Sequence, residues 1–94
     1  MQIRSSVRGM AALMEQQLTA NDHKGGWQAE TEYSLYHRLL EEVAELYEAL
    51  FTRQNIGKEA ADVANFAMMI ADVTGELRVV RQRALGEEAP DDGK

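Results

Sequence analysis

The amino-acid sequence predicts an all-α fold, for two reasons. Apolar residues recur every three or four positions through most of the 94-residue chain, which is the spacing that one face of an α-helix requires. The chain has a single proline, Pro90, and most of its seven glycines stand where this apolar pattern pauses, as in helices joined by short connectors. Because no segment alternates strictly between apolar and polar residues, no strand is expected.

A first helix is expected over about residues 3–20. Its larger apolar residues are three or four positions apart; they are Ile3, Val7, Met10, Met14 and Leu18. A loop should follow over residues 21–27, because its polar side chains and the pair Gly25 and Gly26 favour turns.

Two further helices are expected, joined by a short connector. One should begin after Thr31, a residue type that commonly caps helix N-termini, and end near Thr52. Its apolar face would consist of Leu35, Leu39, Val43, Leu46 and Leu50. The other should follow Asn55 as its cap and continue to about Leu77, with Gly75 weakening or kinking it near its end. Its apolar residues are Ile56, Val63, Phe66, Ile70, Val73 and Leu77.

These helices would form one domain over residues 1–86. Residues 87–94 combine charge, glycine and proline without periodicity, so we expect a disordered acidic tail there. The absence of cysteine excludes a disulfide-stapled secreted fold, a thiolate metal site and a cysteine nucleophile.

The charge and hydropathy of the sequence indicate which classes of partner to expect. No apolar run approaches the roughly 20 residues of a membrane span, and the N-terminus lacks a signal-peptide core. We therefore expect a cytoplasmic protein with no membrane partner. A net charge of −6 without a basic stripe argues against binding of long nucleic acid, although a phosphorylated small molecule could bind through a cation.

Two acidic residues on each of the last two helices carry the functional hypothesis. At about 100° per residue, Glu42 borders the apolar face of its helix, and Glu45 lies beside it on the same surface. Glu59 and Asp62 fall within the apolar stripe of the third helix. An ionised carboxylate is unfavourable there unless a partner neutralises it.

Few cations are placed to neutralise these acids. The nearest on the third helix are Lys58 and Arg78, neither of which lies on the apolar stripe, and Arg38 of the second helix could pair with one acid only. If the two helices pack antiparallel, four carboxylates converge near the connector, and we expect a divalent cation between them. Oxygen ligands favour Mg²⁺, Mn²⁺ or Ca²⁺ over Zn²⁺.

Two other interpretations of these acids stay open. The first is a helical bundle whose acids face solvent or are bridged by Arg and Lys of a partner chain. The second is a di-iron carboxylate bundle, which needs a histidine three residues after a glutamate. Neither His23 nor His37 stands in that position relative to the four acids.

The spacing of the acids resembles a known signature. Glu41-Glu42-Val43-Ala44-Glu45, thirteen intervening residues and Glu59-Ala60-Ala61-Asp62 are similar to the Glu-Glu-x-x-Glu and Glu-x-x-Asp motifs of the all-α nucleotide pyrophosphohydrolases. That group includes MazG-like proteins, dimeric dUTPase, dCTP pyrophosphatase and phosphoribosyl-ATP pyrophosphohydrolase. The resemblance extends over about residues 23–75.

The resemblance implies a function and a set of metal ligands. The family hydrolyses a nucleoside triphosphate, NTP or dNTP, between its α and β phosphates and releases a monophosphate and pyrophosphate. Carried over to this chain, the Mg²⁺ ligands are Glu42, Glu45, Glu59 and Asp62, with Mn²⁺ as a possible substitute, and Glu41 is assigned to orienting water. The implied architecture is a helical hairpin that forms a four-helix bundle core with a second subunit.

Three further residues are candidates for binding the substrate. Lys24 could contact phosphate, Trp27 could stack on the base, and Asn65 could bind a base edge through its amide. The alternatives are an exposed lysine, a core tryptophan and an asparagine bonded to a neighbouring helix. The sequence favours no particular base and neither sugar.

The same residues are compatible with a different class of function, a non-catalytic helical module that binds nucleotide or another protein. We also expect a homodimer or a tetramer built from dimers. The third helix is apolar around most of its circumference from Val63 to Val73, and the other helices of one chain would leave part of that surface uncovered.

Overall fold

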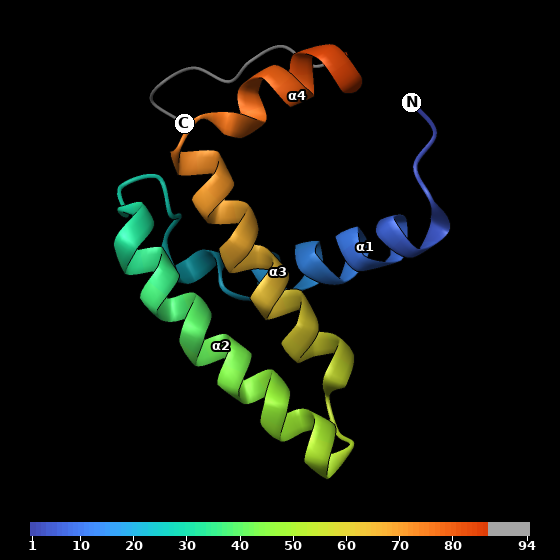
Figure 1. Cartoon of the computed structure of the whole chain (residues 1–94), viewed down its shortest axis with the longest axis vertical. Helices are drawn as coiled ribbons and strands as arrows, with labels where there is room; N and C mark the ends of the chain where they lie inside the picture. Colours follow the sequence, from blue (N-terminus) through green and yellow to red (C-terminus); the bar gives the residue numbers. More distant parts are fainter. Residues whose placement is uncertain (87–94) are drawn as a thin grey trace.

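The computed structural model describes residues 1–86, which form four α-helices, one short 3₁₀-helix and no strand. This confirms the all-α prediction for that part of the chain. The elements, shown in Figure 1, are α1 (Ser5–Ala20), η1 (Asp22–Lys24), α2 (Glu32–Thr52), α3 (Ile56–Val73) and α4 (Glu76–Ala84). None of these helices is long and apolar enough to cross a membrane. The predicted acidic tail, residues 87–94, lies outside the described residues.

The local signals around α2 act largely as the sequence predicts. The Thr31 hydroxyl accepts a hydrogen bond from the backbone N–H of Ser34 at 3.1 Å, which caps the helix. After Thr52, both Arg53 and Asn55 adopt left-handed backbone conformations, with φ of 57° and 58°. These two residues reverse the chain within a short connector, so α2 and α3 form an antiparallel hairpin (Figure 1). Asn55 stands at the predicted cap position, but its side chain makes no capping hydrogen bond.

The helix expected from Ile56 to Leu77 ends at Val73 instead, and the interruption falls at Gly75, the residue expected to weaken or kink it. The Thr74 hydroxyl lies 2.9 and 3.0 Å from the carbonyl oxygens of Ile70 and Ala71, so it competes for acceptors in the last turn. Gly75 then takes a φ of 85°, which glycine adopts without a steric penalty. The following helix, α4, starts beyond the end of α3 and runs away from it in a new direction (Figure 1).

Helix α3 is central, because α1, α2 and α4 all pack against it. Small residues let α1 come close: a Cβ atom on Gly57 would lie 3.5 Å from Leu13 of α1, and Ala61, one turn further along, is fully buried. The next residue on this face, Asn65, donates a hydrogen bond from Nδ2 to the carbonyl oxygen of Met14 at 3.1 Å. The sequence analysis did not identify this side of α3 as the contact with α1.

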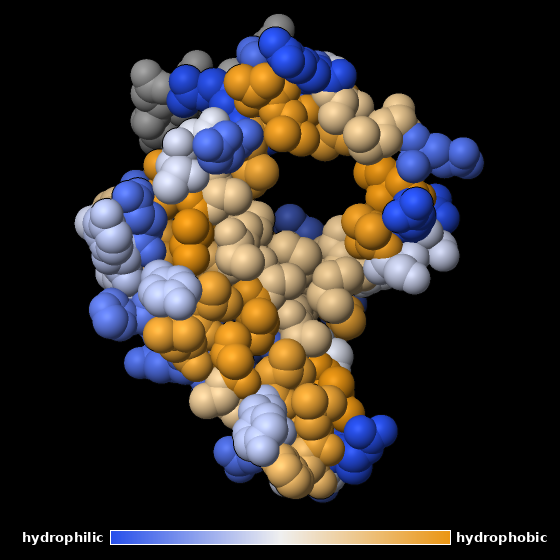
Figure 2. Space-filling model, in the orientation of Figure 1, coloured by the Kyte–Doolittle hydropathy of each residue, from blue (hydrophilic) through white to orange (hydrophobic). Residues whose placement is uncertain are grey.

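More exposed large apolar side chains belong to α2 than to any other element, whereas the expectation was that α3 would lack partners. No large apolar side chain of α3 is exposed, since α1 and α2 lie on two sides of it. Val43 and Leu50, expected to face inward, are each 45% exposed, while Leu35 and Ala49 are buried. Seven large side chains of α2 are between 45% and 74% exposed and form what we call the α2 stripe: Tyr33, Tyr36, Leu40, Val43, Tyr47, Leu50 and Phe51. Figure 2 shows apolar residues along the α2–α3 hairpin.

The helix break can be tested with two glycine substitutions of opposite expected sign. Gly75→Ala should lower the free energy of unfolding by about 1 kcal/mol, because alanine is strained at positive φ. Gly9→Ala lies inside α1 with open space around it and should raise that free energy by roughly 0.5–1 kcal/mol. Chemical denaturation followed by circular dichroism measures both. A stabilised Gly75→Ala variant would show that α3 and α4 form one continuous helix.

Candidate functional site

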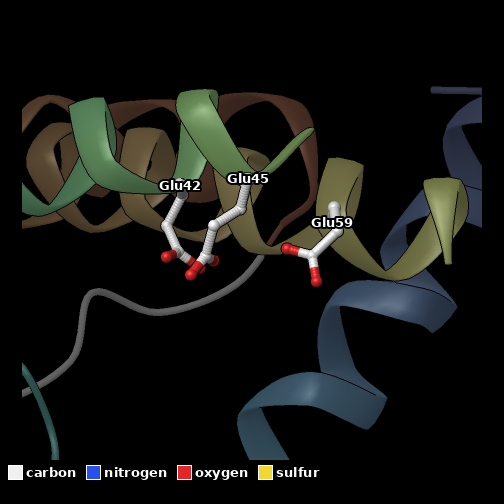
Figure 3. A group of neighbouring side chains, drawn as sticks. All are labelled: Glu42, Glu45 and Glu59. Atoms are coloured by element: carbon white, nitrogen blue, oxygen red, sulfur yellow. The ribbon is translucent and has the colours of Figure 1, made fainter. Parts of the chain in front are cut away.

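The hairpin brings together three of the four predicted metal ligands. Glu42 and Glu45 of α2 face Glu59 of α3, and one carboxylate oxygen from each lies within 4.8 Å of the other two. Figure 3 shows the first two side chains directed to the same point and Glu59 reaching it from the opposite helix. The convergence expected from helical phase is therefore present, as an acidic cluster on the seam between α2 and α3.

The fourth acid, Asp62, lies close to the cluster but is engaged by a lysine. Lys58 Nζ is 3.0 Å from Asp62 Oδ2 and 3.3 Å from Glu59 Oε1. Lys58 lies off the apolar stripe, as expected, but its long side chain spans one helical turn to Asp62, so the acids have a counter-ion that the sequence analysis did not assign to them. The spacing of four between the two residues was a usable signal for this pair.

Burial and the neighbouring acids together raise the proton affinity of Glu42. Partial burial raises the pKa of its carboxyl to about 7, and a hydrogen bond with Glu45 and the negative charges of Glu45, Asp62 and Glu59 act in the same direction. The Glu59 Oε2 atom is buried and has no hydrogen-bond partner within residues 1–86. At neutral pH the metal-free cluster would thus be neutralised partly by a proton on Glu42 and partly by Lys58.

A cleft of about 400 Å³ opens beside the acids. Its walls come from the end of α1, the loop after η1, α2 and α3. Three acids of the motif and all three predicted substrate-binding residues line it, together with two further cations. These residues are Lys24, Trp27, Arg38, Glu42, Glu45, Lys58, Asp62 and Asn65. Metal-binding and substrate-binding candidates therefore share one cavity, although they are far apart in the sequence.

Trp27 has features of both roles considered for it, a core residue and a platform for the base. Its indole is half-buried, and Nε1 donates a hydrogen bond to Asp72 Oδ2 of α3 at 2.9 Å. The other oxygen of this carboxylate lies 4.0 Å from Arg81 of α4. Asp72 thus holds the loop against α3, and the indole lines the cleft from a fixed position. The sequence analysis missed this role of Asp72.

Asn65 is 3% exposed, and only one half of its amide is satisfied. Because the Met14 carbonyl is an acceptor, the amide nitrogen must face it, and this bond confirms the alternative of contact with a neighbouring helix. The Oδ1 atom is buried and has no hydrogen-bond partner in the described part of the chain. A buried acceptor left in this state costs roughly 1–3 kcal/mol, and Asn65 is one of the residues that line the cleft.

Two other predicted residues contribute differently from expectation. The guanidinium of Arg38 lies 4.9 Å from the centre of the Phe66 ring and pairs with no acid among residues 1–86. Both residues line the cleft, so this cation is held at the wall by an aromatic face. Glu41 is exposed and does not line the cleft, and nothing in this placement supports a role in orienting water.

Comparison with known proteins identifies no relative. No family model matches the chain, and neither a curated protein nor a solved structure matches it significantly. The functional hypothesis therefore depends on the acidic motifs and on the chemistry of the cleft.

Proposed function

We propose that this chain is a Mg²⁺-dependent nucleotide pyrophosphohydrolase, which cleaves an NTP or dNTP between the α and β phosphates. The observation that carries the proposal is a single cleft that combines converging carboxylates with cationic side chains. A nucleoside triphosphate with bound Mg²⁺ has the complementary chemistry, because the metal suits the carboxylates and the phosphates suit the cations.

The acidic cluster fits a divalent cation such as Mg²⁺, with Mn²⁺ as a substitute. Mg²⁺ binds oxygen ligands at about 2.1 Å, so neighbouring ligand oxygens stand roughly 3–4 Å apart. Oxygens of Glu42, Glu45 and Glu59 within 4.8 Å of one another need small side-chain adjustments to reach that spacing. The elevated pKa of Glu42 and the unpartnered oxygen of Glu59 both indicate a cluster short of positive charge. Asp62 would complete the set once Lys58 released it.

The remaining residues of the cleft would bind and orient the nucleotide. A bound metal ion supplies charge neutralisation and an activated water, and hydrolysis needs no covalent nucleophile. Lys24 and Arg38 would bind phosphate oxygens, and the fixed indole of Trp27 offers a platform for the base. Asn65 Oδ1 would accept a hydrogen bond from an N–H of the base or from a ribose hydroxyl.

A second copy of the chain is the partner that the α2 stripe favours. At about 100° per residue its seven side chains fall within an arc of about 100°, as a helix-packing face does. Pairing two hairpins along this face would give a four-helix core with two-fold symmetry, in a dimer or a tetramer built from dimers. The same exposed surface favours the alternative function, a non-catalytic nucleotide-binding or protein-interaction module.

The reaction is tested by incubating the protein with individual NTPs and dNTPs and Mg²⁺. We expect at least one substrate to give monophosphate and pyrophosphate in equal amounts, and chelation by EDTA to stop the reaction. Separation of the products by ion-exchange chromatography identifies the cleaved bond. Release of orthophosphate, or nucleotide binding without turnover for every substrate, would exclude the proposed reaction and favour the non-catalytic module.

The metal ligands are tested by Glu59→Gln and Asp62→Asn. Each variant should lose at least about 100-fold in turnover yet remain helical, because removing a charge from a repulsive cluster weakens metal binding more than packing. Their metal-free forms should melt no lower than the wild type. Glu48→Gln is the matched control, since this glutamate is exposed on α2 and lies outside the cleft. Wild-type turnover in both test variants would place the metal elsewhere.

The interface is tested with two double variants of α2. Val43→Gln with Leu50→Gln makes the α2 stripe polar, and Glu41→Gln with Glu48→Gln introduces the same residue at the same spacing on another face. Light scattering coupled to gel filtration should show the wild type and the second variant at two or four times 10.5 kDa, and the first variant at a lower mass. A monomeric wild type at micromolar concentration would contradict the proposed dimer.

A further inference from the structure

We propose that Lys58 is an exchangeable counter-ion: its ammonium holds Glu59 and Asp62 in the metal-free protein and moves to the phosphates of the substrate when a divalent cation replaces it. This inference rests on the proposed function, because it needs a metal ion in the acidic cluster. It adds a role for a residue outside the acidic motifs.

The geometry places Lys58 between the two groups it would serve. Its Nζ contacts one oxygen of Asp62 at 3.0 Å and one of Glu59 at 3.3 Å. The side chain also lines the cleft that would hold the phosphates. Figure 3 shows Glu59 facing Glu42 and Glu45, so an ion at this point and the ammonium would share the Glu59 carboxylate.

The lysine of this ion pair is more exposed than its two acidic partners, so it is the side chain that can move. The Lys58 side chain is 50% exposed, whereas those of Glu59 and Asp62 are 16% and 14% exposed. Moving the lysine breaks a half-exposed pair, and such pairs contribute little to stability. The carboxylates cannot move into water as easily, so they need a positive charge in place of the one that leaves.

The negative charge of the cluster favours a divalent ion over the Lys58 ammonium. One ammonium carries a single positive charge opposite four carboxylates, and Glu59 Oε2 keeps no partner within the described chain. A divalent ion supplies more charge and binds several oxygens at once. It would also repel the ammonium from the shared oxygens, since like charges a few ångströms apart disfavour each other. The four-carbon stem of lysine lets the displaced ammonium reach a phosphate in the same cleft.

A simple surface ion pair between Lys58 and Asp62 predicts a different outcome, so two binding measurements on Lys58→Gln separate the two roles. The first is Mn²⁺ binding to the full-length protein, followed by electron paramagnetic resonance of the free ion. Without a competing ammonium, Lys58→Gln should bind Mn²⁺ about two- to fivefold more tightly than the wild type. Arg8→Gln is the control, because it removes the same charge from an exposed position outside the cleft and should leave Mn²⁺ affinity nearly unchanged.

The second measurement uses inorganic tripolyphosphate with saturating Mn²⁺, followed by isothermal titration calorimetry. Here Lys58→Gln should bind roughly tenfold more weakly, because a charged hydrogen bond to phosphate is lost. Lys58→Arg keeps the charge and should retain most of the affinity.

Opposite shifts for Mn²⁺ and tripolyphosphate would support the exchange, which a purely structural pair would not produce. Unchanged or weaker Mn²⁺ binding by Lys58→Gln, or unchanged tripolyphosphate binding, would overturn it. Neither measurement requires turnover. A wild type that binds no Mn²⁺ would overturn the proposed metal site as well, whereas a wild type that hydrolyses nucleotide while Lys58→Gln shows no opposite shifts would overturn this inference alone.

Discussion

Repulsion among four carboxylates on the α2–α3 seam is the constraint that shapes the rest of the site. The antiparallel hairpin presses acids of one helix against acids of the other, where partial burial weakens the screening that water would provide. The elevated pKa of Glu42, the contact of Lys58 with two acids and the unpartnered oxygen of Glu59 all follow from this arrangement. A hairpin selected for stability alone would place apolar side chains at such positions. In the proposed function, a divalent cation would supply the positive charge that these acids lack.

Each face of helix α3 makes contact with a different neighbour. The small residues Gly57 and Ala61 allow α1 to pack closely on one face of α3. On the same face, Asn65 forms a hydrogen bond with α1. The acids lie toward α2, and near the end of the helix Asp72 holds Trp27. Three contacts with distant parts of the sequence thus assemble one cleft. Because α1 and α2 pack on two sides of α3, the large apolar side chains of α3 are covered, while seven of those of α2 stay exposed.

Sequence periodicity, together with the short connector, predicts the α2–α3 hairpin and its converging acids, but it does not predict which face of a helix a neighbouring helix covers. The start of α2 at Thr31 and the convergence of Glu42, Glu45 and Glu59 follow from capping and from the helical repeat. The helical repeat gives no information about which neighbour covers a face, so the contact of α1 with α3 and the exposure of Val43 were missed. A helical projection also ignores side-chain length. For that reason Lys58, which lies off the apolar stripe, was not counted as a partner of these acids.

Catalysis and assembly can coexist on α2 because they would use different faces of it. At about 100° per residue, Glu42 and Glu45 lie roughly 80° or more beyond the edges of the α2 stripe. A second copy docked along the stripe would therefore leave the mouth of the cleft open. It would also cover Tyr47 and Phe51, whose rings already contact each other edge to face at 4.9 Å. In such a pair, α3 would hold one side of α2 and the second copy would hold the stripe. Glu42 and Glu45 would then approach a bound metal ion from a helix that is held on two sides.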